Sequence, residues 1–342
     1  MSSARMVIPR IRADLRRGIT MPDSEYRPIS FYHVGPNAGT KNCNPGSSGH
    51  VGRPTVEALL AQGIHTITAI QRIEATSTFP PEVVIKPDDL KDESFLTSAF
   101  QGQDVVVLVL PLPELVTLQE PAVRAVAKAG VPYILPAEFG PDPFVTRLIE
   151  ENQLLQDKKK IRDLNEELGV SSWISVVVGS FLDMNIISGL WGIDVENRKA
   201  TIWTGAVGKI NTSSVAQTGQ ATAAVLSLPE QDLSRYKNKA FYVPSFHLTQ
   251  KELLQAAQKA TGTANQDWEI DYQDVNDALK DCNDKIQQKD ATAPFVKFFL
   301  THFREGSGGD FESKVDASEV KKLHEIGLQK EAVDDVLKRT VS

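Results

Sequence analysis

Three glycines spaced three residues apart, Gly46, Gly49 and Gly52, constrain the fold of this chain more than any other feature. A helical pattern at 54–63 follows them at once, and an apolar strand pattern at 64–70 follows the helix. Such a loop presents backbone N–H groups and a helix N-terminus, which together bind anions and most often a pyrophosphate. Turns also use glycine, so the loop alone is weak evidence. The helix and strand after it favour a mononucleotide-binding unit.

The end of the second predicted strand indicates which dinucleotide would bind. That strand ends in Gln71 and Arg72. An acidic residue at this point would hydrogen-bond the ribose hydroxyls, whereas an arginine suits a 2′-phosphate. The sequence therefore favours NADP(H) over NAD(H) as the cofactor.

The glycine loop does not directly follow the first predicted strand, 29–34, which ends at Gly35. Residues 41–45 lack a strand pattern, and joining Gly35 to Ser47 would restore a continuous motif. We therefore interpret 36–46 as an insertion in the phosphate loop, which leaves Gly35 and Gly46 as alternatives for the first glycine. Extra loop length costs only about 0.6 kcal/mol per doubling. A tolerated bulge, a gene-model error and a lesion that weakens cofactor binding are all open.

Strand and helix patterns alternate from residue 29 to about 178, and several strands are continuous apolar runs, as in a sheet covered on both faces. This order predicts an α/β fold with a doubly wound parallel sheet of the Rossmann, NAD(P)-binding type. We expect a tail at 1–28, the Rossmann domain at 29–180, and at 181–342 mostly a smaller α+β substrate-binding domain with C-terminal helices. Residues 306–309, Gly-Ser-Gly-Gly, suggest a flexible joint. The predicted strands are 29–34, 65–70, 82–86, 105–110, 133–135 and 172–178, and the predicted helices are 54–61, 93–100, 118–129 and 144–168.

Composition limits the possible partners. The 342 residues carry a net charge of −7 and no long basic tract, which argues against nucleic-acid binding. No apolar run reaches the roughly 18 residues that span a bilayer, and the two cysteines form no metal motif. The arginine-rich residues 1–20 suggest a disordered tail, a start codon placed too early with Met21 as the true start, or a mitochondrial import signal. We expect a cytoplasmic protein with a small-molecule substrate and no metal; its oligomeric state is open.

Many dehydrogenases use a tyrosine whose phenol pKa is lowered by a lysine four residues later, and no tyrosine here has such a lysine. Lysine chemistry is therefore the leading catalytic hypothesis. In the run Lys158-Lys159-Lys160, helical geometry at 100° per residue puts Lys158 on the edge of an apolar stripe and turns the other two outward. Burial would lower the pKa of an inward lysine, which could then act as a general acid or base. The alternative is a lysine that extends its ammonium to solvent.

Two further features flank the carboxyl ends of predicted strands, where such folds bind ligands. The segment 136–143, rich in proline and glycine, would hold Phe139 as a flat apolar wall, or would be only a rigid turn. Gln119 could hydrogen-bond the cofactor or a neighbouring loop, or could be a helix-surface amide.

Together these residues resemble the NmrA-like, isoflavone-reductase-like branch of the atypical short-chain dehydrogenases, and fungal members in particular. The resemblance covers roughly 29–340 and also includes Glu138-Phe139-Gly140, Arg162 and the stretch from Trp173 to Asp183. It implies NADP(H) binding, Lys158 as the general acid/base, Phe139 near the nicotinamide and Arg72 on the 2′-phosphate. The predicted cofactor-binding residues are Gly35, Gly46, Ser48, Gly49, His50, Val51, Gly52, Arg72, Gln119, Phe139 and Lys158.

The resulting hypothesis is an NADPH-dependent oxidoreductase that reduces a small, aromatic or conjugated, secondary-metabolite-type substrate, with Lys158 managing the proton. The alternative is an NmrA-like regulatory protein that senses the dinucleotide without turnover. Retention of Lys158 favours the enzyme, whereas the interrupted phosphate loop favours the regulator.

Overall fold

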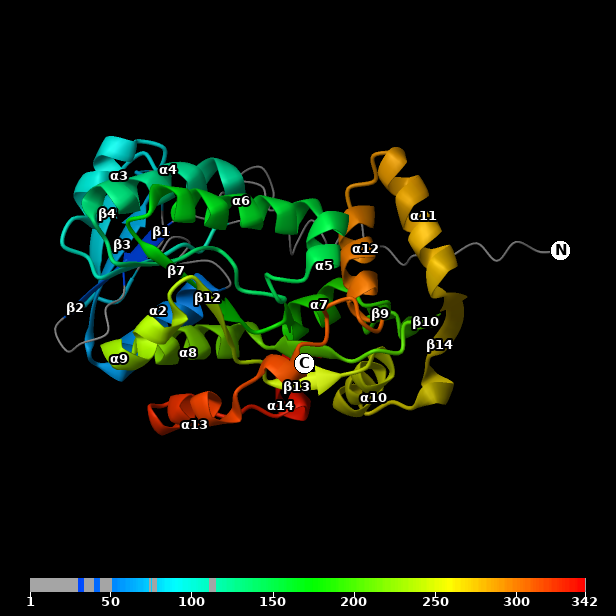
Figure 1. Ribbon diagram of the computed structural model, residues 1–342. Helices are drawn as coiled ribbons and strands as arrows, with labels where there is room; N and C mark the ends of the chain where they lie inside the picture. The colour runs from blue at the N-terminus through cyan, green and yellow to red at the C-terminus, as the bar shows by residue number, and fades with distance from the viewer. Residues whose placement is uncertain are drawn as a thin grey trace.

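The computed structural model describes residues 30–33, 40–43, 51–73, 75, 79–110 and 115–341. In these residues eight strands form one sheet in the order β12-β7-β6-β5-β1-β2-β3-β4. Helices cover both faces of this sheet, and a second unit lies beyond one end of it (Figure 1). The strands of the sheet are β1 (Ser30–His33), β2 (Thr40–Cys43), β3 (His65–Gln71), β4 (Val84–Pro87), β5 (Val105–Val107), β6 (Tyr133–Leu135), β7 (Ser172–Val177) and β12 (Lys239–Tyr242).

The central strands are apolar on both faces, which is why helices pack on each side. Along β5, Val105 and Val107 face one hydrophobic cluster while Val106 and Leu108 face the other, and all four are fully buried. The first cluster lies under α2 (Gly52–Gln62) and α8 (Val215–Leu226). The second lies under three other helices: α3 (Glu93–Phe100), α4 (Leu115–Ala129) and α6 (Gln153–Leu168). The predicted doubly wound fold is confirmed.

The start of the sheet differs from the prediction. The predicted first parallel strand, 29–34, is β1, and it runs antiparallel to β2, β3 and β5. The strand that runs parallel to β3 and β5 is β2, which falls within 36–46, the segment interpreted as a loop insertion. Two short strands share the hydrogen-bonding edge of β3. β2 pairs with its first residues, from His65, and β1 pairs with its last residues, up to Gln71. Backbone N–H and C=O groups buried in a sheet need such partners, so this segment enters the sheet.

The predicted single helix 144–168 is two helices, α5 (Thr146–Glu151) and α6. Asn152 separates them with an extended backbone (φ −134°, ψ 113°). Its side-chain amide donates to the Leu148 carbonyl at 2.8 Å, which satisfies an oxygen that the interrupted helix leaves free. An asparagine side chain can replace a helical backbone bond in this way. The apolar periodicity gives no sign of such a bond, so it did not predict the break.

The chain after residue 180 returns to the Rossmann sheet before it completes the second unit. β12 pairs parallel with β7, and α8 packs on α2, so the expected boundary at 180 divides the sequence but not the sheet. The second unit contains two three-stranded sheets and a core around Trp191, Trp203 and Phe303. Its strands are β8 (Ser180–Phe181), β9 (Ile193–Asp194), β10 (Lys199–Thr204), β11 (Ile210–Ser213), β13 (Phe246–Leu248) and β14 (Glu269–Asp274).

Several helices surround this second unit and the far face of α8 (Figure 1). They include α7 (Leu182–Ser188), α9 (Glu230–Leu233), α10 (Gln250–Thr261), α11 (Val275–Gln287), α12 (Ala293–His302), α13 (Ala317–Glu325) and α14 (Val333–Val341).

The segment 306–309, expected to be a flexible joint, is closely packed at its last three residues, whereas Gly306 is exposed. Ser307 is buried, and a Cβ atom on Gly308 would lie 2.6 Å from the Val145 side chain. A Cβ atom on Gly309 would lie 2.2 Å from the His302 carbonyl oxygen. Gly308 and Gly309 permit close approach of chains rather than mobility.

The contact between α2 and α8 generates a stability prediction at Gly219. A Cβ atom there would lie 2.5 Å from the backbone carbonyl carbon of Pro54, so the two helices would have to separate. Helix propensity alone would make Gly219→Ala stabilising by about 1 kcal/mol. We expect the opposite, a loss of about 1–3 kcal/mol from overpacking, measured by urea unfolding.

The matched control is Ala216→Leu, which adds bulk to the exposed side of the same helix and should change stability by less than about 0.5 kcal/mol. A Gly219→Ala protein as stable as the parent or more stable would contradict the close packing.

Candidate active site

The candidate site is the loop 136–143, which follows β6 at the carboxyl edge of the parallel sheet. Ligands of doubly wound folds bind at this edge. Gly140 forms an isolated parallel bridge with Val177, and its carbonyl accepts a hydrogen bond from the Gly179 N–H at 2.9 Å. The loop is therefore bonded to the end of β7 and does not project freely.

Lys158 reaches this loop from the buried face of α6. Its side chain is buried, with only 6% of the residue exposed, whereas Lys159 and Lys160 are exposed and paired with aspartates. The Lys158 Nζ donates to the Glu138 carbonyl oxygen at 3.3 Å. The inward orientation predicted from helical periodicity is confirmed.

The surroundings of Lys158 disfavour its charged form. Burial lowers the pKa of the Lys158 ammonium from its usual value. The Glu138 carboxylate acts against this shift, and the Arg162 guanidinium lowers the pKa further. An amine with a lowered pKa releases its proton more readily than an ordinary lysine, which suits it to general acid–base catalysis.

A buried ion pair between Glu138 and Arg162 lies directly beside this amine. The Arg162 Nη1 donates to the Glu138 Oε1 at 2.5 Å, and its Nη2 donates to the Pro143 carbonyl at 2.9 Å. The guanidinium also lies 5.7 Å from the centre of the Trp173 ring. Arg162 thus binds both ends of the loop, from a position one helical turn after Lys158.

Sequence reasoning included Glu138 and Arg162 only as parts of a family resemblance and gave them no role. The signal was present: an arginine four residues after an inward lysine lies on the same helix face. A charge so placed needs a buried partner, and loop 136–143 offers two acids, Glu138 and Asp142.

Gln119 supports the same loop from α4. It is 1% exposed, and its side-chain oxygen accepts a hydrogen bond from the Ala137 N–H at 2.8 Å. Of the alternatives predicted, the structure therefore shows the bond to a neighbouring loop and excludes a helix-surface amide. Phe139 is half-buried and packs against the hydrophobic cluster under α2 and α8.

The other predicted cofactor residues lie elsewhere along the carboxyl edge. Arg72 directly follows β3, and Val51 and Gly52 begin α2. Val51 has no side-chain cap within the described part of the chain, so the first-turn N–H groups of α2 lack the usual side-chain acceptor. Five predicted residues lie outside the described residues: Gly35, Gly46, Ser48, Gly49 and His50.

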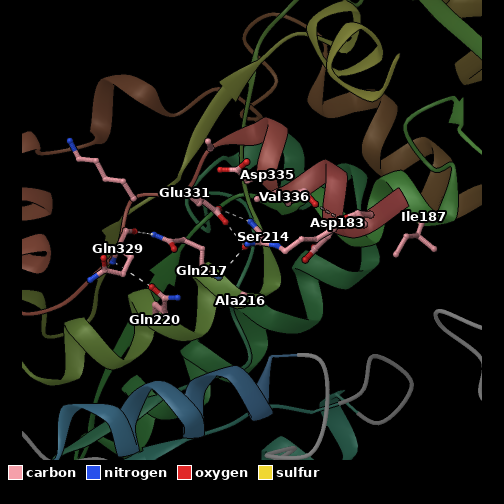
Figure 2. Close-up of a pocket in the computed structure, with 14 residues that line it drawn as sticks. Asp183, Ile187, Ser214, Ala216, Gln217, Gln220, Gln329, Glu331, Asp335 and Val336 are labelled. Atoms are coloured by element: carbon pink, nitrogen blue, oxygen red, sulfur yellow. Dashed lines mark hydrogen bonds between the residues drawn. The ribbon is translucent and has the colours of Figure 1, made fainter. Parts of the chain in front are cut away.

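A cavity of about 530 Å³ lies away from this loop, at the start of α8 (Figure 2). Two of its acids bond to the start of the helix: Glu331 accepts from the Ser214 N–H and hydroxyl at 3.0 and 2.6 Å, and Asp183 accepts from the Val215 N–H at 3.1 Å. Burial, and to a smaller degree Glu331, raises the pKa of Asp183. These contacts stabilise the helix terminus and account for the carboxylates without a ligand.

Within the described residues no cluster of His, Cys, Asp and Glu side chains could hold a metal ion. In the same part of the chain, no helix combines the length and apolarity needed to cross a membrane.

Comparison with known proteins gives consistent relatives. Residues 45–325 match the model of the NmrA-like family. Oxidoreductase aprR of Aspergillus flavus is 28% identical over 287 residues, which cover 81% of this chain and 92% of that protein. An isoflavone reductase homolog of Zea mays, IRL, is 30% identical over 64% of this chain and 73% of its own length.

Among solved structures, AtPrR2 with NADP+ and (+)pinoresinol is 26% identical, with a TM-score of 0.69 over 86% of this chain and 97% of that one. These comparisons confirm the predicted family and fold. They also agree with the predicted class, an oxidoreductase that uses NADP(H).

The buried ion pair beside Lys158 gives a stability prediction. Glu138→Gln would leave the Arg162 charge buried without its partner, which typically costs about 3–5 kcal/mol. We expect a loss of this size in urea unfolding, and the double variant Glu138→Gln/Arg162→Met should lose less than the sum of its single changes.

Glu151→Gln is the matched control, because Glu151 pairs with Arg147 at a similar 2.9 Å on the exposed surface of α5. Exposed pairs contribute about 0–1 kcal/mol. Equal losses in the two glutamine variants would show that burial of the Glu138 pair has no energetic consequence.

Proposed function

The chain belongs to the NmrA-like family, and from that membership we propose that it is an NADPH-dependent reductase of a small aromatic or conjugated substrate. The observation that supports this most directly is Lys158, a buried amine with a lowered pKa at the carboxyl edge of the sheet. Such placement is expensive for a lysine with a purely structural role, and it is characteristic of catalytic acids and bases.

The described residues fit the dinucleotide at two places. Among the described residues no side chain caps the start of α2, which suits an anionic diphosphate at its first-turn N–H groups. Arg72, at the end of β3, would hold the 2′-phosphate, and Phe139 would form an apolar wall beside the nicotinamide. When bound, NADPH would supply the hydride.

Lys158 would supply the proton that balances this hydride. Its ammonium would transfer a proton from Nζ to the substrate oxygen that gains negative charge, whether a carbonyl oxygen or the oxygen of an opening benzylic ether. In the reverse direction the neutral amine would take that proton back. The Glu138 carbonyl, 3.3 Å away, orients Nζ through the hydrogen bond between them.

The substrate class follows from the relatives and from the expected domain organisation. AtPrR2 was solved with pinoresinol, an aromatic ether, and the Zea mays relative is named for isoflavone reductase. We propose a secondary metabolite of comparable chemistry, enclosed between the Rossmann unit, which also includes α8 and β12, and the second unit formed by most of 181–342.

A regulatory protein that binds the dinucleotide without turnover is the second candidate. The observation that favours it is β1, which lies antiparallel beside Ile70 and Gln71, near the sheet edge where the dinucleotide would bind. The two candidates share the cofactor and differ in turnover, so one experiment separates them.

Replacing Lys158 by alanine tests the enzyme proposal. We expect turnover of a panel of enones, aryl ketones and benzylic ethers such as pinoresinol to fall by roughly 10²–10⁴-fold, while NADPH affinity measured by fluorescence titration stays close to that of the parent. NADPH binding without oxidation above the Lys158→Ala background would support the regulator. Absence of saturable NADPH binding would exclude both candidates.

The pH dependence of kcat should have a defined sign. Reduction needs protonated Lys158, and the pKa of this group is lowered. As pH rises through that lowered pKa, kcat for reduction should fall, and this decline should begin below the ordinary lysine pKa of 10.5. Oxidation of the alcohol product should show the opposite limb, and Lys158→Ala should show neither.

Arg72→Ala should change cofactor preference. Loss of a charge-assisted hydrogen bond to a phosphate costs about 1.5–3 kcal/mol, so the Kd for NADPH should rise roughly ten- to hundredfold while the Kd for NADH changes little. Arg124→Ala is the control, because Arg124 is an exposed arginine on α4 paired with Glu120. Equal weakening of both dinucleotides in Arg72→Ala would remove the 2′-phosphate role.

A further inference from the structure

Asp142 is a buried carboxylate in loop 136–143 that the proposed chemistry does not use. It is 0% exposed and accepts hydrogen bonds from the Phe144 N–H at 3.0 Å and the Tyr242 hydroxyl at 2.9 Å. It also forms an ion pair with Lys314. The three partners come from the residue directly after the loop, from β12 and from the short helical turn η4 (Glu312–Lys314). Segments 100 and 172 residues away in sequence therefore meet on one carboxylate.

Lys314 belongs to a segment, residues 308–315, that we call the strap. The Asn211 side chain bonds to two neighbouring residues of the strap. Its oxygen accepts from the Phe311 N–H, and its amide nitrogen donates to the Glu312 carboxylate, each at 2.7 Å. Phe311 is buried, with its ring 5.6 Å from that of Tyr242. Together with the close packing at Gly308, these contacts make the strap a rigid support for Lys314.

A short series of contacts joins Asp142 to Lys158. Residue 143, next to Asp142, offers its carbonyl to Arg162 at 2.9 Å. Arg162 pairs with Glu138 at the other end of the loop, and the Glu138 carbonyl accepts from Lys158. A displacement of the loop at Asp142 would therefore move the carbonyl that orients the amine.

We infer that Lys314 and Asp142 are positioning residues, through which the strap fixes the loop that orients Lys158. The inference rests on the proposed function for the role of Lys158. Lys314 is 44% exposed along its side chain while Asp142 is fully buried. Without Lys314 the carboxylate would stay buried with no cation beside it, an arrangement that favours movement of the loop toward water.

The test compares Lys314→Met with Lys322→Met in the full-length protein. Lys322 is a matched control, because it is 38% exposed and pairs with Glu319 and Asp232 without contacting the loop. We expect Lys314→Met to accelerate hydrogen–deuterium exchange at the amides of residues 137–144 and to leave the rest of the sheet protected. We also expect kcat to fall roughly ten- to hundredfold with the Kd for NADPH unchanged.

Two conservative variants sharpen the result. Lys314→Arg keeps the cation and should restore both loop protection and most of kcat. Tyr242→Phe keeps the ring against Phe311 but removes the hydroxyl that donates to Asp142, so it should change exchange and kcat in the same direction by a smaller factor.

The outcomes separate this inference from the proposed function. Unchanged loop exchange in Lys314→Met, or an equal change in Lys322→Met, overturns the inference. Faster loop exchange with an unchanged kcat, in an enzyme that Lys158→Ala inactivates, also overturns it and leaves the proposed function intact. Turnover by Lys158→Ala equal to that of the parent overturns the proposed function instead.

Discussion

The burial of three charged or chargeable groups, Glu138, Lys158 and Arg162, is the constraint on which the site depends. Each would be costly in an apolar interior by itself. Together they are tolerated, because the carboxylate faces the guanidinium and the amine bonds to a carbonyl of the same loop. The pair also determines the shape of the loop after β6. Arg162 bonds to Glu138 and to Pro143, so the loop curves around this one side chain.

The two units of the molecule are joined by more than a linker. α8 and β12 come from the second half of the sequence, yet they complete one face and one end of the Rossmann sheet. The strap then links the second unit to the carboxyl edge through Asn211 and Asp142. In Figure 1 the C-terminal elements accordingly lie along the side of both units rather than beyond them.

The features predictable from sequence were those with a local period. Apolar runs gave the buried strands, and the 100° spacing along 144–168 gave the inward turn of Lys158, because both depend only on residues close in the chain. The break at Asn152 was missed, since one side-chain bond to Leu148 decides it. The pairing of Thr40–Cys43 within the sheet was also missed. These residues have no strand pattern of their own, and they pair because backbone groups of β3 and β5 need hydrogen-bond partners.

Contacts between residues far apart in the sequence could not be predicted, for the same reason. Nothing near Asp142 in sequence indicates Lys314, and nothing near Gly219 indicates Pro54; each pair exists only once the sheet has assembled. Gln119 shows the intermediate case. Its place at the start of a helix limited the options to a few, and the contact with Ala137 decided between them.

The parallel pairing of β12 with β7 also has a consequence for biosynthesis. About 60 residues separate these neighbours in the chain, so when synthesis has reached only the end of β7, that strand lacks the partner that covers its outer side. The hydrophobic surface that α2 offers to α8 is uncovered at the same stage. Unpaired strand edges and bare apolar faces are the features that associate between nascent chains. Until residues up to 242 have been made, the growing chain therefore exposes the outer side of β7 and the α2 surface together, which favours association between nascent chains.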